Sequence, residues 1–262
     1  MARTALLNVM VQAAMKAGRS LARDFGEVSN LQVSVKGPGD FVSAADRKAE
    51  KIVFEELSKA RPGYSFLMEE SGVVEGKDDQ HRWIIDPLDG TTNFLHGIPV
   101  FGVSIALETQ GKLVAGVVYN PAMDELYTAE YGGGAFFNDR RLRVANRKEM
   151  TDCVFATGIP HLGRPAHGDF LEQQRRVMLN SSGVRRFGAA ALDLCFVAGG
   201  RVDGFWETGL SPWDMAAGMV IVKEAGGFIS DLDGGQDMFT KTSIVAGNET
   251  IHRKLRETVN GK

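Results

Sequence analysis

The sequence contains little cysteine, little net charge and no long uninterrupted run of apolar residues. Its only two cysteines, Cys153 and Cys195, exclude a disulfide framework and predict reduced, buried thiols in a cytoplasmic protein. No apolar run approaches the roughly 20 residues that a membrane-spanning helix needs. The 30 Lys and Arg nearly balance the 33 Asp and Glu, so the net charge of -3 gives no reason to expect nucleic acid or an anionic membrane as the main partner.

The first half of the chain has enough apolar residues for a core, arranged with the periods of helices and short strands. Residues 3–24 and 44–57 each place apolar side chains along one helical face. Short runs rich in β-forming residues and separated by Gly or Pro predict strands at 64–68, 83–85, 100–107, 113–119, 126–129 and 135–137. These elements indicate an antiparallel sheet with helices alongside, in an α+β lobe of about residues 1–146.

The second half alternates strands and helices. Strands are expected at 154–157, 184–187, 204–207, 228–230 and 244–247, and helices at 169–179, 189–198, 212–225 and from 249 onward. This alternation predicts an α/β lobe of about residues 147–262. No long linker separates the halves, so their junction is the expected place for a ligand site.

The segment from Trp83 to Asn93 carries the clearest chemical signal. A buried strand ends in Asp86-Pro87-Leu88-Asp89-Gly90, whose two carboxylates can converge on one cation together with the Leu88 carbonyl. Ligands that are all oxygen favour Mg²⁺ or Mn²⁺ over zinc. Gly90 allows a close approach of the backbone, and a helix beginning after it would direct N–H groups at an anion.

A purely structural explanation competes with the metal site, because Asp-Pro-Leu-Asp-Gly is also a good turn and helix-capping sequence. Further acids weaken that explanation: Glu69 and Glu70 follow a strand-like run, and Asp46 and Asp214 occupy the first turns of predicted helices. Each acid alone is typical of a cap or a solvated surface. Together they place several carboxylates at the ends of elements.

These ordered motifs make the sequence similar to the inositol monophosphatase family, in particular its bacterial branch. The resemblance covers nearly the whole chain and rests on Asp40-Phe41-Val42-Ser43 before Asp46, Glu69-Glu70-Ser71, Trp83 to Asn93, Gly188-Ala189-Ala190-Ala191-Leu192-Asp193, and Trp213-Asp214-Met215-Ala216-Ala217-Gly218 followed by Glu224-Ala225-Gly226-Gly227. It implies a layered αβαβα sandwich and a lithium-sensitive, Mg²⁺-dependent phosphomonoesterase that hydrolyses myo-inositol monophosphate. Attack by a metal-activated water in line with the leaving group needs no covalent nucleophile.

The resemblance also implies residue roles. Two to three Mg²⁺ ions, or Mn²⁺, would be bound by Glu69, Asp86, the Leu88 carbonyl, Asp89 and Asp214. Thr91, hydrogen-bonded to Asp46, would position the attacking water with support from Glu69, and Asp46 would reach a third ion through water. Lys36 would lie beside a loop that closes over the site. The substrate would contact Leu88, Asp89, Gly90, Thr91, Arg185, Ala190, Glu207 and Asp214, with Arg186 as a neighbouring cation.

Substrate and partners stay open at this point. Met68 and Ala189 depart from the residues common in the family, so the pocket could instead accept fructose 1,6-bisphosphate, histidinol phosphate or a 3'-phosphoadenosine nucleotide. The resemblance implies a homodimer. Some bacterial relatives also associate with the transcription antitermination machinery, and the basic segment from Arg140 to Arg143 is the feature of this sequence that would support such a role.

Overall fold

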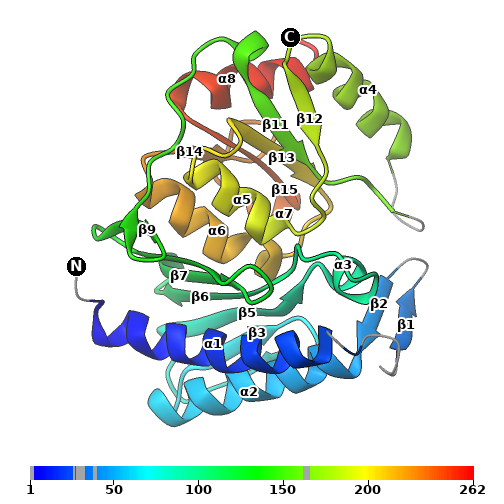
Figure 1. Ribbon diagram of the computed structural model, residues 1–262. Coiled ribbons are helices and arrows are strands. Elements are labelled where there is room, and N and C mark those ends of the chain that lie inside the picture. Colours follow the sequence, from blue (N-terminus) through cyan, green and yellow to red (C-terminus); the bar gives the residue numbers. More distant parts are fainter. Residues whose placement is uncertain (1–2, 26, 28–32, 38–39, 162–165) are drawn as a thin grey trace.

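The computed structural model describes residues 3–25, 27, 33–37, 40–161 and 166–262. The helices of the described part are α1 (Ala5–Phe25), α2 (Ala44–Ala60), α3 (Thr91–Leu95), α4 (His167–Met178), α5 (Ala190–Ala198), α6 (Pro212–Glu224), α7 (Met238–Lys241) and α8 (Glu249–Val259). Figure 1 shows five layers: α1 with α2, a first sheet, α5 with α6, a second sheet, and α4 with α8. This order is the αβαβα sandwich that the family resemblance implies.

The first sheet has eight strands in the order β10-β9-β8-β7-β6-β5-β3-β4. They are β3 (Ser65–Met68), β4 (Gly72–Val74), β5 (His81–Asp89), β6 (Gly102–Thr109), β7 (Lys112–Asn120), β8 (Glu125–Glu130), β9 (Gly134–Phe137) and β10 (Arg140–Arg141). Neighbouring strands are antiparallel except β3 and β5, which run parallel. The expected antiparallel sheet is therefore mixed. The strand β4 runs back along one edge of β3, and the chain then reverses again, so β5 pairs with the other edge of β3 in parallel.

The second sheet has five strands in the order β12-β11-β13-β15-β14. They are β11 (Val154–Thr157), β12 (Gly183–Arg185), β13 (Gly204–Thr208), β14 (Phe228–Ser230) and β15 (Ser243–Gly247). A separate hairpin is formed by β1 (Val33–Gly37) and β2 (Asp40–Ser43), and a short 3-10 helix, η2, spans Met150–Asp152. The sequence patterns did not predict this hairpin, β4, β10, η2 or α7, since short elements carry too few residues for a period to show.

The two central helices differ from the outer ones in their side chains. Every residue of α5 is buried, and so are eight consecutive residues of α6, Met215–Val222. A helix that is apolar on all sides must be covered on all sides. Both helices accordingly pack in one core that also contains Ile84 and Val118 of the first sheet and Phe205 and Ile244 of the second.

Two cores cover the outer faces of the sheets. One lies between α1, α2 and the first sheet and includes Leu21, Val53 and Trp83. The other includes Leu255 and Trp206, between α8 and the second sheet. The strands of the first sheet precede residue 146 and those of the second follow it, but α5 and α6 contact both sheets, so the division into two lobes stays a prediction.

The state of the two cysteines agrees with the prediction from the sequence. Cys153 and Cys195 are both buried and unpaired with each other. Among the described residues, no helix combines the length and apolar character needed to cross a membrane.

Candidate functional site

The site is built where β5 ends. The antiparallel pairing of β5 with β6 shifts register between Asp86 and Asp89, which lifts the intervening residues out of the regular ladder. The Asp86 carboxylate accepts a hydrogen bond from the Leu88 N–H at 2.9 Å and stabilises this bend. The bend thereby carries both carboxylates and the Leu88 carbonyl that the sequence singles out.

Asp86 lies at the centre of a group of acids. Its side chain is 2% exposed. Burial raises the pKa of Asp86 well above its usual range, and the nearby charges of Glu69, Asp89 and Asp214 raise it further. These four acids come from β5, from the residue after β3 and from the start of α6, so the fold brings together carboxylates that are far apart in sequence.

Asp89 caps a helix that lies elsewhere in the chain. Its carboxylate accepts hydrogen bonds from the backbone N–H groups of Ala190, at 3.2 Å, and Ala191, at 2.8 Å, in the first turn of α5. Burial raises the pKa of Asp89 to about 7; the bonds from α5 oppose that rise, and the charge of Glu69 adds to it. The first turn of α5 has no cap from its own sequence, since the preceding residue is Ala189.

Asp46 and Thr91 are in direct contact. The Thr91 hydroxyl donates to Asp46 Oδ1 at 2.9 Å and also lies 3.1 Å from the Leu88 carbonyl oxygen. The other oxygen of Asp46 accepts from the N–H of Ser43 at 2.8 Å, in a capping box that begins α2. Burial raises the pKa of Asp46, and its hydrogen bonds with Ser43 and Thr91 limit that rise.

Asp214 has the same place in α6 that Asp46 has in α2. It is the third residue of the helix, and its carboxylate accepts from the N–H of Ser211 at 2.7 Å. Asp46, Asp89 and Asp214 therefore each lie at a helix N-terminus, where the helix dipole and free N–H groups favour negative charge. This arrangement lets the fold hold acids close together.

The loop that follows Asp89 is fixed by two residues. Gly90 has a φ of +88°, and a Cβ atom there would lie 2.9 Å from the Val100 carbonyl oxygen, so both conformation and space require glycine. The buried Asn93 side chain donates to the carbonyl oxygens of Val100 and Phe187, each at 2.7 Å. In the sequence Asn93 stands out only as the last residue of the motif that begins at Trp83, and no local pattern indicates these two contacts.

Another contributor that sequence reasoning missed is Glu50 on α2. Its carboxylate accepts hydrogen bonds from the Glu70 N–H and the Ser71 hydroxyl, in the turn that carries Glu69. The sequence did contain a signal for Glu50, because this acid falls on the helical face that is otherwise buried. The other buried residues of α2 are Ala45, Asp46, Ala49, Val53 and Leu57.

Asp193 lies close enough to Glu207 and Asp89 for both charges to act on it. A Cβ atom on Gly158 would lie 1.9 Å from Glu207 Oε1, so the Glu207 carboxylate rests directly on that glycine. Asp193 of α5 is 1% exposed, and neither of its carboxylate oxygens makes a hydrogen bond within the described residues. Burial raises the pKa of Asp193, as do the charges of Glu207 and Asp89, whereas the charge of Arg186 lowers it.

The two arginines before α5 differ in their contacts. Arg185 donates to the carbonyl oxygen of its neighbour Val184 at 3.1 Å and lies against Gly183. The Arg186 guanidinium lies over Gly188, where a Cβ atom would be 2.5 Å from Nη1. Gly188 is adjacent to Gly90, since a Cβ atom on Gly90 would lie 3.3 Å from the Gly188 carbonyl oxygen. The side chain of Lys36 lies outside the described residues.

The acids fit a divalent cation by chemistry. In the described part of the chain, no three His, Cys, Asp or Glu side chains are already arranged as metal ligands around one point. The acids around Asp86 nevertheless lie close enough to raise its pKa, and uncompensated buried carboxylates cost several kcal/mol each. A hard cation would offset that cost, and donors that are all oxygen suit Mg²⁺ or Mn²⁺.

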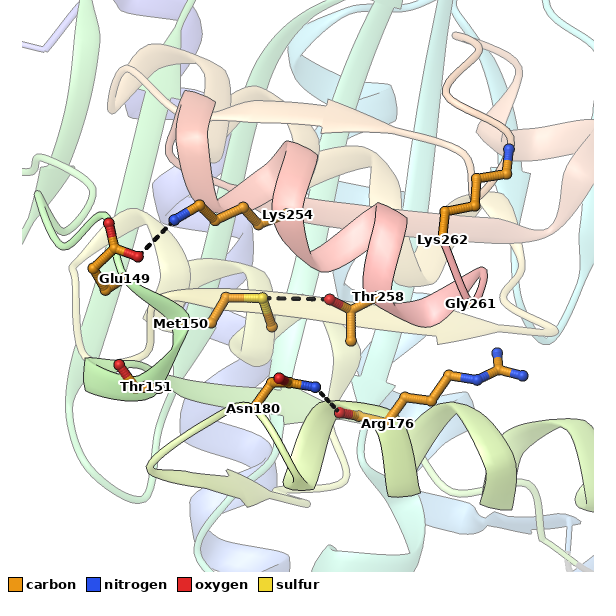
Figure 2. Close-up of a pocket in the computed structure, with 9 residues that line it drawn as sticks. All are labelled: Glu149, Met150, Thr151, Arg176, Asn180, Lys254, Thr258, Gly261 and Lys262. Carbon is orange, nitrogen blue, oxygen red and sulfur yellow. Dashed lines mark hydrogen bonds and ion pairs between the residues drawn. The ribbon is translucent and has the colours of Figure 1, made fainter.

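A separate cavity of about 430 Å³ lies between α4 and α8 (Figure 2). It is lined by Glu149, Met150, Thr151, Arg176, Asn180, Lys254, Thr258, Gly261 and Lys262. Lys254 already pairs with Glu149 at 2.8 Å, and Arg176 lies 3.3 Å from Glu172 and donates to the Val259 carbonyl oxygen. Because these cations are engaged and none of the predicted site residues lines the cavity, we assign it no role in the chemistry.

Comparisons with known proteins agree with the motifs and the fold. A sequence model of the inositol monophosphatase family matches residues 2–262. The chain is 73% identical over 259 residues to the inositol-1-monophosphatase of Mesorhizobium japonicum, with 99% of this chain and 97% of the relative covered. It is 42% identical over 250 residues to the Nus factor SuhB of Escherichia coli K12, with 95% and 94% covered.

A solved structure is also similar. The crystal structure of the extragenic suppressor protein suhB from Bartonella henselae is 67% identical and matches with a TM-score of 0.96, covering 98% of both chains. The match of a family model to nearly all of the sequence, together with the shared fold, shows that the chain belongs to the inositol monophosphatase family.

Proposed function

We propose that this protein is a Mg²⁺-dependent phosphomonoesterase that hydrolyses myo-inositol monophosphate to inositol and phosphate. Phosphatases of this family generally depend on metal ions. The observation that carries the proposal is the gathering of Glu69, Asp89 and Asp214 around the buried Asp86. The 73% identity to an inositol-1-monophosphatase supports the choice of substrate.

Glu69, Asp86, the Leu88 carbonyl, Asp89 and Asp214 would hold two to three Mg²⁺ ions, and Mn²⁺ could replace them. When bound, these ions would lower the pKa of the attacking water and neutralise charge on the phosphate and on the leaving oxygen. The chain itself supplies the acidic cradle, the hydrogen bonds that orient the water and the contacts that hold the substrate.

Thr91 would orient the attacking water molecule. Its hydroxyl hydrogen is directed at Asp46 Oδ1, 2.9 Å away, which leaves the lone pairs of Thr91 Oγ1 available to accept a hydrogen bond from water. The Glu69 carboxylate would accept the second hydrogen of that water. In this proposal Asp46 fixes the direction of the Thr91 hydroxyl and also reaches a third ion through water.

The substrate would lie against the loop after β5 and the start of α5. The backbone N–H groups of Gly90 and Thr91 would donate to the phosphate, beside Leu88, Asp89 and Asp214. Ala190 and Glu207 would contact inositol hydroxyls, and Arg185 and Arg186 would supply cations on the substrate side. Glu207 suits a polyol contact by its chemistry, because a carboxylate accepts hydrogen bonds from vicinal hydroxyls.

A substrate panel tests this function directly. The purified protein is assayed for phosphate release from myo-inositol 1-phosphate, fructose 1,6-bisphosphate, histidinol phosphate and 3'-phosphoadenosine 5'-phosphate, with Mg²⁺, with Mn²⁺, with chelator and with added Li⁺. We expect the highest kcat/KM for inositol phosphate, loss of activity with chelator and inhibition by Li⁺. Preference for another ester would replace the substrate, and absence of turnover on all of them would refute the enzymatic function.

A second candidate function is association with the transcription antitermination machinery. The 42% identity to a Nus factor favours it, and Arg140, Arg141 and Arg143 are exposed on this protein. Capture from bacterial extract with the Asp89→Asn variant, followed by identification of bound RNA polymerase subunits, separates the two functions. A complex that persists without catalytic activity would show that binding is independent of hydrolysis.

Two further properties belong to the same proposal. We expect a homodimer, which light scattering of the purified protein would reveal as twice the chain mass. The two buried, unpaired cysteines are consistent with a cytoplasmic location, where thiols stay reduced.

A further inference from the structure

Glu50 is a buried acid that the proposed chemistry does not use. It lies on α2, four residues after Asp46, so the two side chains share one face of the helix. Its exposed fraction is only 4%, and it forms no ion pair within the described residues. A buried carboxylate without a cation requires hydrogen-bond donors around it, and the identity of those donors shows what it does.

Both oxygens of Glu50 accept hydrogen bonds from one short turn. Oε2 accepts from the backbone N–H of Glu70 at 2.9 Å, and Oε1 accepts from the hydroxyl of Ser71. The turn connects β3 to β4, whose last pair is Met68 with Gly72. Glu50 therefore joins α2 to the turn that begins with Glu69.

Glu69 is held from the other side by the sheet. Its backbone N–H donates to the Ile85 carbonyl oxygen at 3.2 Å, and Ile85 directly precedes Asp86. With Ile85 on one side and Glu50 on the other, the backbone of residues 69–71 has little freedom. The Glu69 carboxylate is thereby kept close enough to Asp86 to raise its pKa.

We infer that Glu50 is a positioning residue that holds the 69–71 turn so that the Glu69 carboxylate completes the cation site with Asp86. The inference rests on the proposed function. Glu50 contacts neither substrate nor cation in this inference and acts only through Glu69. The same helix then sets two parts of the site, because Asp46 orients Thr91 and Glu50 orients Glu69.

Four single variants test the inference. Glu50→Ala removes both hydrogen bonds. Glu50→Gln keeps the volume, and its amide can accept from the Glu70 N–H while donating to the Ser71 hydroxyl. Glu55→Ala is the matched control, since Glu55 is an exposed acid on the same helix. Ser71→Ala removes one of the two donors and serves if Glu50→Ala does not fold.

The main measurement is calorimetric titration of each chelator-treated protein with Mg²⁺ and with Mn²⁺, which needs no substrate. We expect Glu50→Ala to weaken cation binding by about 10-fold or more, the usual effect of losing a residue that orients a metal ligand. Glu50→Gln should bind nearly as well as the unchanged protein, and Glu55→Ala should be indistinguishable from it. The cation affinity of Ser71→Ala should lie between that of Glu50→Ala and that of the unchanged protein.

A double-mutant cycle with Glu69→Gln identifies the route of the effect. If Glu50 acts through Glu69, adding Glu50→Ala to Glu69→Gln should produce little further loss of cation affinity. Equal losses in both backgrounds would overturn the inference, as would a drop in melting temperature with unchanged cation affinity. Failure of the proposed function is a different result: the unchanged protein would bind cations and hydrolyse none of the esters tested.

Discussion

The carboxylate of Asp89, at the end of β5, accepts a hydrogen bond of 2.8 Å from the backbone N–H of Ala191, in the first turn of α5. A residue proposed as a metal ligand is thus also the cap of a helix that begins 101 residues further along the chain. The capping explanation and the metal-site explanation of the sequence motif are therefore compatible. Because of this double role, a substitution of Asp89 affects stability through the helix cap and activity through the metal site, and the two effects can differ.

Asp89→Asn should abolish most of the activity while the protein stays folded. The amide preserves volume but has one acceptor oxygen, so it can cap only one of the two N–H groups, at a cost of about 1 kcal/mol. The substitution also removes a carboxyl group whose pKa is raised to about 7 by burial. Loss of this buried charge stabilises the fold, because it relieves repulsion from Glu69. At pH 8 without metal we expect a melting temperature at or above that of the unchanged protein.

The check on Asp89→Asn combines phosphate release with thermal unfolding. A loss of at least about 100-fold in kcat/KM is expected for removal of a ligand charge at the reacting centre. Hydrolysis at the original rate would show that Asp89 is not part of the site.

The stability of the metal-free protein should fall as the pH rises from 6.5 to 8. The pKa of Asp89 is about 7 in the folded state, whereas its ordinary value is 3.8. At a pH just below 7 the folded protein therefore binds more protons than the unfolded chain. It loses stability as these protons dissociate with rising pH. Burial shifts the pKa of Asp86 and of Asp193 in the same direction. His252, whose pKa is lowered to about 4, has the opposite effect, but only below about pH 6.5.

Added Mg²⁺ should reverse this trend. A cation binds the ionised carboxylates, so it competes with protons and stabilises the fold more at pH 8 than at pH 6. Differential scanning calorimetry at both pH values, with chelator and with Mg²⁺, measures the effect, and the Asp89→Asn variant should show a smaller one. A metal-free protein that gains stability between pH 6.5 and pH 8 would contradict the prediction.

Gly158→Ala should change substrate preference more than stability. The added methyl group would lie 1.9 Å from Glu207 Oε1 and must displace that carboxylate, which is the movable end of a side chain. We expect the KM for inositol phosphate to rise about 10-fold, the scale of one lost pocket contact. The KM for p-nitrophenyl phosphate, which has no polyol, should stay nearly constant; equal changes for both esters would argue against a polyol role of Glu207.

The arginine pair before α5 gives a further prediction. Because the Arg186 guanidinium lies over Gly188, next to Gly90, whereas Arg185 contacts Val184 and Gly183, we expect Arg186→Gln to raise KM more than Arg185→Gln. Because the charge is exposed, we expect a modest change in KM of about 2- to 5-fold, and high salt should reduce this change.

Steady-state kinetics at low and high salt measure these changes in KM, with Arg253→Gln as an exposed control on α8. Light scattering accompanies them. A change of oligomeric state in Arg186→Gln without a change in KM would refute the prediction.

The sequence by itself determined the position of the long helices and the residue types on which the proposed site rests. Apolar periods located the long helices to within a few residues, as for α2 at Ala44–Ala60 and α6 at Pro212–Glu224, because burial of one face or of a whole helix imposes a pattern on neighbouring residues. The motif from Asp86 to Asp89 identified a loop of oxygen donors, since hard cations select residue types as well as positions.

Only the tertiary structure decided which distant groups meet. No local pattern joins Asp89 to the first turn of α5, Glu50 to the turn after Glu69, or Glu207 to Gly158. Local patterns also do not show that β3 pairs with β5 in parallel. That pairing depends on the edge of β3 that β4 occupies and on the direction in which the chain then returns. Local sequence records the burial of each residue, whereas contacts between segments depend on how whole layers stack. That stacking brings Glu69, Asp89 and Asp214 close enough to Asp86 to raise its pKa.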